Sequence, residues 1–258
     1  MAIRNTRYHR YAPWAMLGAI VLVWQLICTA FEVSEFIFPG PWAILKALFE
    51  FWGPIQSHAI QTFWTTMTGF GLGIIVGVAL GTLVGSSRLF YSALSPLMVG
   101  FNAIPKAAFV PILVVWFGIG TIPAILTAFL ICFFPIVVNV ATGLATVEPE
   151  MEDVLRVLGA SRWDVLIKVG LPRSLPYFFA SLKVAITLAF VGSVLSETVA
   201  SNRGIGYLMM SAGSQMRMPL VFAGLIVNSV MAMLMYEFFA LLERRLTGWA
   251  TRGMDGVS

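Results

Sequence analysis

The sequence predicts an all-α, polytopic membrane protein with six transmembrane helices. Hydrophobic residues make up 59% of the chain and charged residues 11%, whereas soluble domains contain roughly 45–50% apolar and about 25% charged residues. Apolar segments recur along the 258 residues, each with the roughly 20 residues that an α-helix needs to cross a bilayer. Proline interrupts several of them, so we expect kinked or broken spans. A single transmembrane domain over residues 1–258 accounts for the whole length.

Six segments are expected to cross the membrane. They cover residues 12–31, 62–85, 92–117, 122–144, 177–200 and 220–242. The first segment follows three arginines, as a secretory signal does, but it is too long for one and further spans follow, so we expect an uncleaved span. Proline lies inside the third span (Pro105 and Pro111) and the fourth (Pro135). Because proline removes a backbone donor, these two spans are predicted to be irregular.

Residues 41–53 are predicted to form a short helix that lies in the membrane interface on the periplasmic side. Pro41 suits the first position of a helix. Lys46 and Glu50 share one face, and apolar residues recur at helical spacing on the other, namely Trp42, Leu45, Leu48, Phe49 and Trp52. This amphipathic pattern is typical of interfacial helices.

Glycine recurs at every fourth position of the second span, at Gly69, Gly73, Gly77, Gly81 and Gly85. Such a stripe lets two helix backbones approach closely. We therefore expect this face to pack on a neighbouring span. The alternative is that it lines a groove for a solute.

Lysine and arginine fix the expected orientation. With the N-terminus in the cytoplasm, eleven of these residues flank the spans on the inside: Arg4, Arg7, Arg10, Arg88, Arg156, Arg162, Lys168, Arg173, Arg244, Arg245 and Arg252. Only Lys46, Arg203 and Arg217 lie outside. The positive-inside rule favours this choice, which places both termini and the polar loop 146–176 in the cytoplasm.

The loop 146–176 carries helical signals of its own. Val154, Leu155 and Leu158 form an apolar stripe, and Gly159 is expected to end that helix, as glycine commonly does. Ser161 precedes Asp164 by three residues, a spacing typical of a capping box.

A second short helix is therefore predicted from Arg162 to Val169. After it, Gly170, Pro172 and Pro176 are expected to turn the chain back into the membrane. A folded, polar loop between two spans is a suitable surface for another protein to bind.

The loop resembles the cytoplasmic EAA loop of permease subunits of bacterial binding-protein-dependent ABC importers. In those proteins an E-A-A triplet is followed after three residues by glycine and nine residues later by I-x-L-P. Asp153-Val154-Leu155 occupies the triplet and matches only in its acidic first residue, whereas Gly159 and the Leu171-Pro172 pair match. Further stretches resemble the nitrate, sulfonate and taurine branch: Ala103-Ile104-Pro105, Val110-Pro111-Ile112, Trp116-Phe117-Gly118-Ile119-Gly120, Ser196-Glu197-Thr198 and Asn202-Arg203-Gly204-Ile205-Gly206-Tyr207.

The resemblance implies partners. A second permease subunit, in a homodimer, would complete the translocation pathway, cytoplasmic ABC ATPase subunits would bind the loop, and a periplasmic solute-binding protein would deliver the solute. ATP and Mg²⁺ would bind to the ATPase, because this chain has no GxxxxGK[ST] phosphate-binding loop and needs no cofactor of its own. The coupling candidates are Asp153, Arg156, Gly159, Ala160, Arg162 and Trp163. The alternative is that these residues only form a folded, solvated loop.

The implied function is that of a permease subunit in the inner membrane, which forms the pathway for a small organic or inorganic anion such as a sulfonate, taurine or nitrate. A vitamin or a pyrimidine precursor is the alternative within the same family. A stand-alone secondary transporter is a more distant alternative, since such proteins often contain internal repeats and the two halves of this chain show none.

Three polar residues inside the spans are candidates for the translocation pathway: Lys106, Asn139 and Glu197. Lys106, beside Pro105, either attracts an anion or extends towards the cytoplasmic interface. Asn139 either bonds a neighbouring helix or lines a cavity. Glu197 either belongs to a gate or is a structural partner of a basic group such as Arg203 or Lys106, since an acidic group is costly within the membrane.

No catalytic or metal-binding group is predicted, so the chain is expected to be a transport subunit rather than an enzyme. His9 and His58 lie far from any cluster of acids or nucleophiles, and Cys28 and Cys132 fall within spans without metal-ligand spacing. The basic residues flank spans rather than covering a soluble face, which argues against nucleic acid as a partner.

Overall fold

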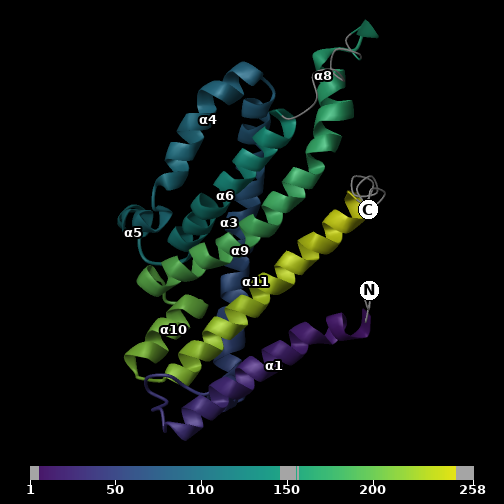
Figure 1. Cartoon of the computed structure of the whole chain (residues 1–258). Coiled ribbons are helices and arrows are strands. Elements are labelled where there is room, and N and C mark those ends of the chain that lie inside the picture. The colour runs from purple at the N-terminus through teal and green to yellow at the C-terminus, as the bar shows by residue number, and fades with distance from the viewer. Residues whose placement is uncertain (1–5, 146–154, 156, 248–258) are drawn as a thin grey trace.

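The computed structural model describes residues 6–145, 155 and 157–247, which are nearly all helical and include no β-strand (Figure 1). The all-α prediction is confirmed. In chain order the elements are α1 (Thr6–Ala30), α2 (Pro41–Glu50), α3 (Trp52–Gly85), α4 (Arg88–Ala103), a 3₁₀ turn η1 (Lys106–Phe109), α5 (Val110–Phe117), α6 (Thr121–Ala145), α8 (Arg162–Val165), a π-helical turn η2 (Leu166–Gly170), α9 (Leu171–Ala200), α10 (Ile205–Ser214) and α11 (Met218–Leu246).

Within the described residues, five helices are long and apolar enough to cross a membrane, and a bent pair makes up the sixth candidate. The bent pair comprises Leu89–Ala103 and Lys106–Phe117, which meet at 70°. Proline explains the bend, because the residue before a proline is pushed out of the helical region. Ile104, before Pro105, is extended at φ −68° and ψ 127°. The break predicted for the third span is thus present.

Proline elsewhere in the membrane does not end the helices. α6 runs as one helix through Pro135, and α9 runs through Pro176. The prediction that Pro172 and Pro176 turn the chain is wrong, because helical residues continue from Arg162 to Ala200 without a break. Pro172 lies in the first two positions of α9, directly after the π-helical turn η2.

Helix α3 begins at Trp52, directly after α2 and well before the predicted start of the second span at residue 62. Its 34 residues correspond to about 51 Å at a rise of about 1.5 Å per residue, which exceeds the roughly 30 Å of a bilayer core. α2 begins with Pro41, as predicted, and buries Ile44 and Ala47. The short helix α10 was not predicted.

Helix α6 lies at the centre of the fold and packs on both α3 and α9. All five glycines of the α3 stripe are buried against α6. A Cβ atom at Gly69 would lie 2.5 Å from the carbonyl oxygen of Ile125, and one at Gly77 would lie 2.9 Å from Cβ of Ile136. The stripe is therefore a close helix contact, which confirms the packing prediction. Gly192 of α9 likewise approaches the backbone of Thr127 and Ala128 in α6.

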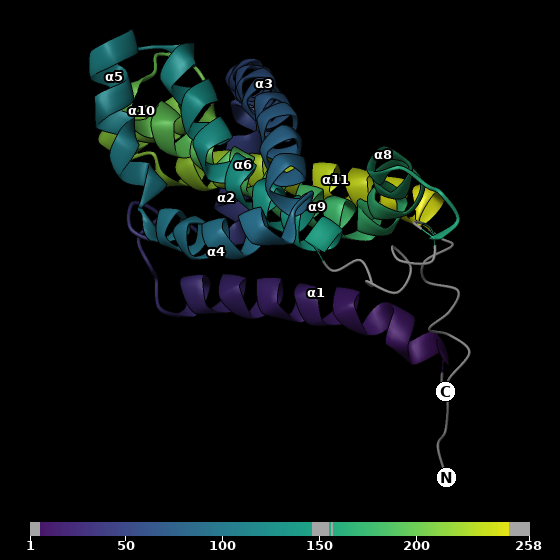
Figure 2. The ribbon, with the colours of Figure 1, turned by 90° about the horizontal axis from the view of Figure 1, so that it is seen from above.

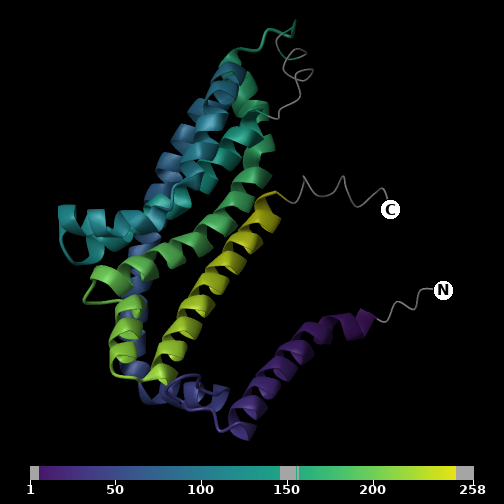
Figure 3. The ribbon, with the colours of Figure 1, turned by 60° about the vertical axis from the view of Figure 1, so that its left-hand side comes forward.

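Helix α1 lies apart from the bundle and approaches it only towards its C-terminal end (Figures 2 and 3). There Trp24 packs against Phe38 and Phe222, and the side-chain oxygen of Gln25 accepts a hydrogen bond of 2.9 Å from the Trp42 N–H. Most of the other side chains of α1 described are exposed and apolar. Such a surface suits contact with lipid.

A pair of glycine variants tests the α3–α6 contact. We expect Gly69→Ala to lower the stability of the purified protein by about 1–3 kcal/mol, because the added carbon overlaps backbone atoms of α6. Gly71→Ala is the matched control, since nothing lies within 4 Å of its added carbon and alanine favours a helix over glycine by about 1 kcal/mol. The measurement is thermal unfolding in detergent. Equal melting temperatures for the two variants would contradict the close contact.

Candidate functional site

Within the second half of the polar loop, the structure describes Leu155 and the residues from Val157 onward. The predicted coupling residues Asp153 and Arg156 lie outside the described residues. Gly159 has a φ of +86°, and the N–H of Ala160 donates a 2.9 Å hydrogen bond to the carbonyl oxygen of Leu155. A left-handed glycine followed by such a bond is typical of a helix C-terminus. The predicted role of Gly159 as a helix end is confirmed.

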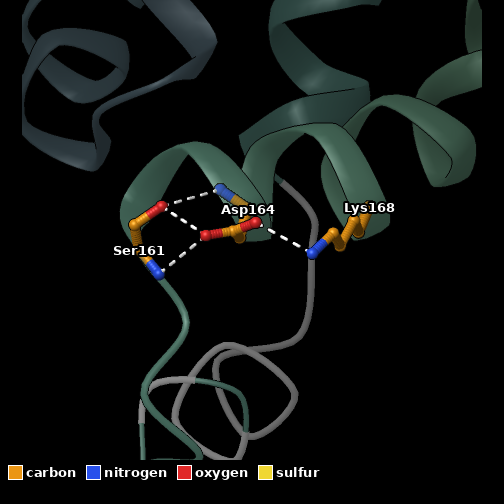
Figure 4. A network of polar contacts seen from close by, with 3 residues as sticks. All are labelled: Ser161, Asp164 and Lys168. Atoms are coloured by element: carbon orange, nitrogen blue, oxygen red, sulfur yellow. Dashed lines mark hydrogen bonds and ion pairs between the residues drawn. The ribbon is translucent and has the colours of Figure 1, made fainter.

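Ser161 and Asp164 form the predicted capping box at the start of α8 (Figure 4). The Asp164 N–H donates to Oγ of Ser161 at 3.2 Å, and the Ser161 N–H donates to Oδ2 of Asp164 at 3.2 Å. Lys168 lies one turn further on, with its Nζ 2.9 Å from Oδ1 of Asp164. Reciprocal bonds of this kind satisfy backbone donors that the helix start leaves free.

The predicted helix 162–169 is present as two parts. Arg162 and Trp163 begin α8, and η2 then adds one π-helical turn before α9. π-helical turns inside α-helices are uncommon and occur frequently at functional sites. Because α8, η2 and α9 are continuous, the loop is attached directly to a membrane helix rather than through a flexible linker.

The two apolar side chains that precede Gly159 are exposed. Val157 is 87% exposed and Leu158 is 76% exposed. Val157 was not among the predicted coupling residues, although it lies next to the expected apolar stripe. Both side chains are available for contact with another protein.

Lys106 lies at the break between α4 and α5. Its Nζ donates hydrogen bonds to the backbone oxygen of Asn102 at 2.7 Å and to its Oδ1 at 2.9 Å, and lies 5.4 Å from the centre of the Phe134 ring. The same side chain lines a cavity of about 480 Å³ among α3, α4 and α6. The other side chains that line it are apolar, so Lys106 supplies its charge.

Asn139, the second pathway candidate, uses its amide within its own helix. Nδ2 donates a 2.8 Å hydrogen bond to the carbonyl oxygen of Pro135. The bond is to its own helix rather than to a neighbouring one. Asn139 is partly buried on α6, and the cavity-lining role stays a prediction.

Glu197, the third candidate, is 2% exposed near the C-terminal end of α9. Its Oε2 accepts hydrogen bonds from Oγ1 of Thr62 at 2.8 Å and from the Gly206 N–H at 3.1 Å. These partners are a hydroxyl and a backbone amide rather than the basic group of one alternative; the other alternative, a role in a gate, stays a prediction. Thr62 was not predicted as a site residue, whereas the Ser196-Glu197-Thr198 and Asn202 to Tyr207 stretches carry the family resemblance.

Comparisons with known proteins place these features in context. Residues 69–248 match the family described as binding-protein-dependent transport system inner membrane component. A probable ABC transporter permease protein of Haemophilus influenzae is 32% identical over 87% of this chain and 91% of its own length. A taurine transport system permease protein of Escherichia coli is 29% identical (90% and 87%), and a riboflavin transport system permease protein of Chloroflexus aurantiacus is 30% identical (92% and 91%).

A solved structure has the same fold. The inward-facing MetNI methionine ABC transporter includes a chain that matches with a TM-score of 0.62 at 18% identity, over 77% of this chain and 98% of that chain. The similarity at this level of identity concerns the fold.

The capping box predicts an unusually acidic carboxyl group. The hydrogen bond from Lys168 and those from Ser161 lower the pKa of Asp164 to about 2, from about 3.9 for an ordinary aspartate. Because the folded-state pKa is depressed, the stabilisation is complete above about pH 4 and is lost as the pH falls through about 2. We expect the ¹³C carboxyl signal of Asp164, in protein held in nanodiscs, to titrate with a midpoint near 2.

The variant Lys168→Met should move that midpoint up towards the ordinary value, because it removes the largest contribution. A wild-type midpoint near 4, unchanged in Lys168→Met, would contradict the capping geometry.

Proposed function

The chain belongs to the family of binding-protein-dependent transport system inner membrane components, and we propose that two copies of it form the pathway through which a separate ATPase drives import of a small anion. It is a permease subunit of an ABC importer and a multi-pass protein of the inner membrane.

The ATPase is proposed to bind the loop 146–176 through the segment that Gly159 and the capping box shape. Gly159 ends one helix and α8 starts at Arg162, so a bound partner would contact Ala160, Arg162 and Trp163 together. Asp153 and Arg156 are proposed to belong to the same contact. The continuity of α8 with α9 is the observation that carries this proposal. A partner that moves α8 also moves a membrane helix, which a flexible loop would not allow.

The assembly is proposed to be a homodimer with both termini of each copy in the cytoplasm. The distribution of lysine and arginine along the sequence supports this orientation. ATP and Mg²⁺ would bind to the ATPase subunits, and a periplasmic binding protein would deliver the solute to the opposite side. The description of the family as binding-protein-dependent supports that last partner.

The solute is proposed to be a small organic or inorganic anion such as a sulfonate, taurine or nitrate. Lys106 supports this class, because its ammonium group is the charge in an otherwise apolar cavity at a break in the membrane helices. The pathway candidates Asn139 and Glu197 would contribute polarity at other positions. The relative named for riboflavin transport supports the alternative that a vitamin or a pyrimidine precursor is carried.

Gly159 gives a direct test of the coupling segment. We expect Gly159→Val to abolish co-purification with the ATPase subunit, because a β-branched residue does not tolerate a φ of +86°. Gly159→Asn should retain most of the complex, since asparagine adopts the left-handed region more readily. Gly100→Val is the control, in a helical position with nothing within 4 Å. Retention of the complex by Gly159→Val would show that the ATPase binds elsewhere.

Lys106 gives a test of the solute class. We expect Lys106→Gln to lower taurine or sulfonate uptake roughly tenfold, since a hydrogen bond from a charged group contributes about 1.5–3 kcal/mol. Lys46→Gln, an exposed lysine of α2, should leave uptake unchanged. The measurement is radiolabelled uptake into proteoliposomes that contain the ATPase and the binding protein. Uptake of riboflavin that is insensitive to both variants would favour the alternative solute.

A further inference from the structure

The N-terminus of α10 is capped by side chains from two other helices. The Gly204 N–H donates to Nδ1 of His58 at 3.0 Å, and the Ile205 N–H donates to Oγ1 of Thr62 at 2.7 Å. The Gly206 N–H donates to Oε2 of Glu197 at 3.1 Å. A helix start leaves its first N–H groups without partners in the helix, and the N-cap residue of α10 has no side chain to bind them. α10 therefore depends on α3 and α9 for its capping.

Thr62 and Glu197 also bind each other. Oγ1 of Thr62 donates to Oε2 of Glu197 at 2.8 Å while it accepts the Ile205 N–H. Both side chains are almost completely buried, at 0% and 2% exposure. We call this pair, with the two N–H groups that it accepts, the Thr62–Glu197 clasp. It joins α3, α9 and α10 at one point, and desolvation makes such bonds costly to break.

Two glycines allow α10 to approach the clasp. A Cβ atom at Gly204 would lie 2.2 Å from Cδ of Glu197, and one at Gly206 would lie 2.4 Å from the carbonyl oxygen of Val194. Gly204 also has a φ of +103°, which other residues rarely adopt. The Asn202 to Tyr207 stretch is thus shaped by contact with Glu197.

The clasp lies near the C-terminal end of α9, whereas α8 and the polar loop lie at its N-terminal end. Helical residues run without interruption from Arg162 to Ala200, and Glu197 is in the last turn. We propose that Thr62 and Glu197 are positioning residues that transmit movement of the cytoplasmic loop to α10. ATP hydrolysis at the loop would then change the position of α10 at the opposite face of the membrane. This role rests on the proposed function, because it assumes that the ATPase moves α8.

The same α3–α9 interface contains a matched control. Thr66, one turn along α3 from Thr62, donates a 2.8 Å hydrogen bond to Oγ of Ser193, one turn along α9 from Glu197. Both residues are fully buried. This hydrogen bond joins α3 to α9 and does not involve α10. Loss of this pair removes a buried hydrogen bond of the interface but leaves the capping of α10 intact.

The test uses the complete transporter, with its ATPase and binding protein, in proteoliposomes loaded for taurine uptake. We expect Thr62→Val to lower uptake per ATP hydrolysed by roughly fivefold or more, the scale of typical coupling between sites, while ATP hydrolysis stays within about twofold of wild type. Thr62→Ser keeps the hydroxyl and should restore the ratio, and Thr66→Val should leave it unchanged.

His58→Ala provides a second variant if Thr62→Val fails to assemble. His58 is only partly buried, and it accepts only the Gly204 N–H. We therefore expect the His58→Ala complex to form and to lose less uptake per ATP hydrolysed than Thr62→Val. Equal effects of Thr62→Val and Thr66→Val, or a fall of hydrolysis in proportion to uptake, would overturn the positioning role. A wild-type complex that hydrolyses ATP without importing any solute would overturn the proposed function instead, and the positioning role with it.

Discussion

The close approach of α3 and α6 along the glycine stripe is the constraint on which the rest of the structure depends. Membrane helices gain little from the hydrophobic effect when they associate, so they rely on tight packing and on a few polar bonds. Glycines 69, 73, 77, 81 and 85 bring the α3 backbone against α6, and Gly192 brings α9 against α6. α3 and α9 also bond each other directly, through the Thr62–Glu197 and Thr66–Ser193 pairs, so the three helices pack on one another. Pro105 separates α4 from α5, and α1 lies apart from these helices.

This packing places the two ends of α9 in different chemical settings. At one end the capping box and Gly159 shape an exposed, folded loop, whose exposed apolar side chains are available to a partner. At the other end Glu197 is enclosed by α3 and α10 and bonded to Thr62. A helix that is fixed to its neighbours by polar bonds at one end and exposed to a partner at the other is suited to carry movement between the two faces of a membrane. The proposed ATPase-driven mechanism uses this arrangement.

Local signals in the sequence predicted the features that depend on backbone chemistry. The glycine interval, the Ser161 and Asp164 spacing and the helix end at Gly159 each act over one or two turns, and the structure has all three. Features that depend on neighbouring helices were not predicted. Pro135 and Pro176 lie within continuous helices, which membrane proteins tolerate where neighbouring groups satisfy the freed backbone. α10 has no charged residue to mark a polar face, unlike α2. The partners of Glu197 come from residues that are 135 positions away (Thr62) and nine positions away (Gly206).

The central claim is that α8, η2 and α9 move together with α10. The most direct measurement is a spin-label distance in the complete transporter, between a label at Ile167 in η2 and one at Met210 on α10, both exposed positions, with Cys28 and Cys132 replaced and with labelled copies diluted by unlabelled ones. The account predicts that this distance stays constant between the nucleotide-free and ATP-bound states, while the distance between Ile167 labels on the two copies changes. A change in the distance within one copy as large as that between copies would contradict it, because the helix would then bend rather than transmit the movement.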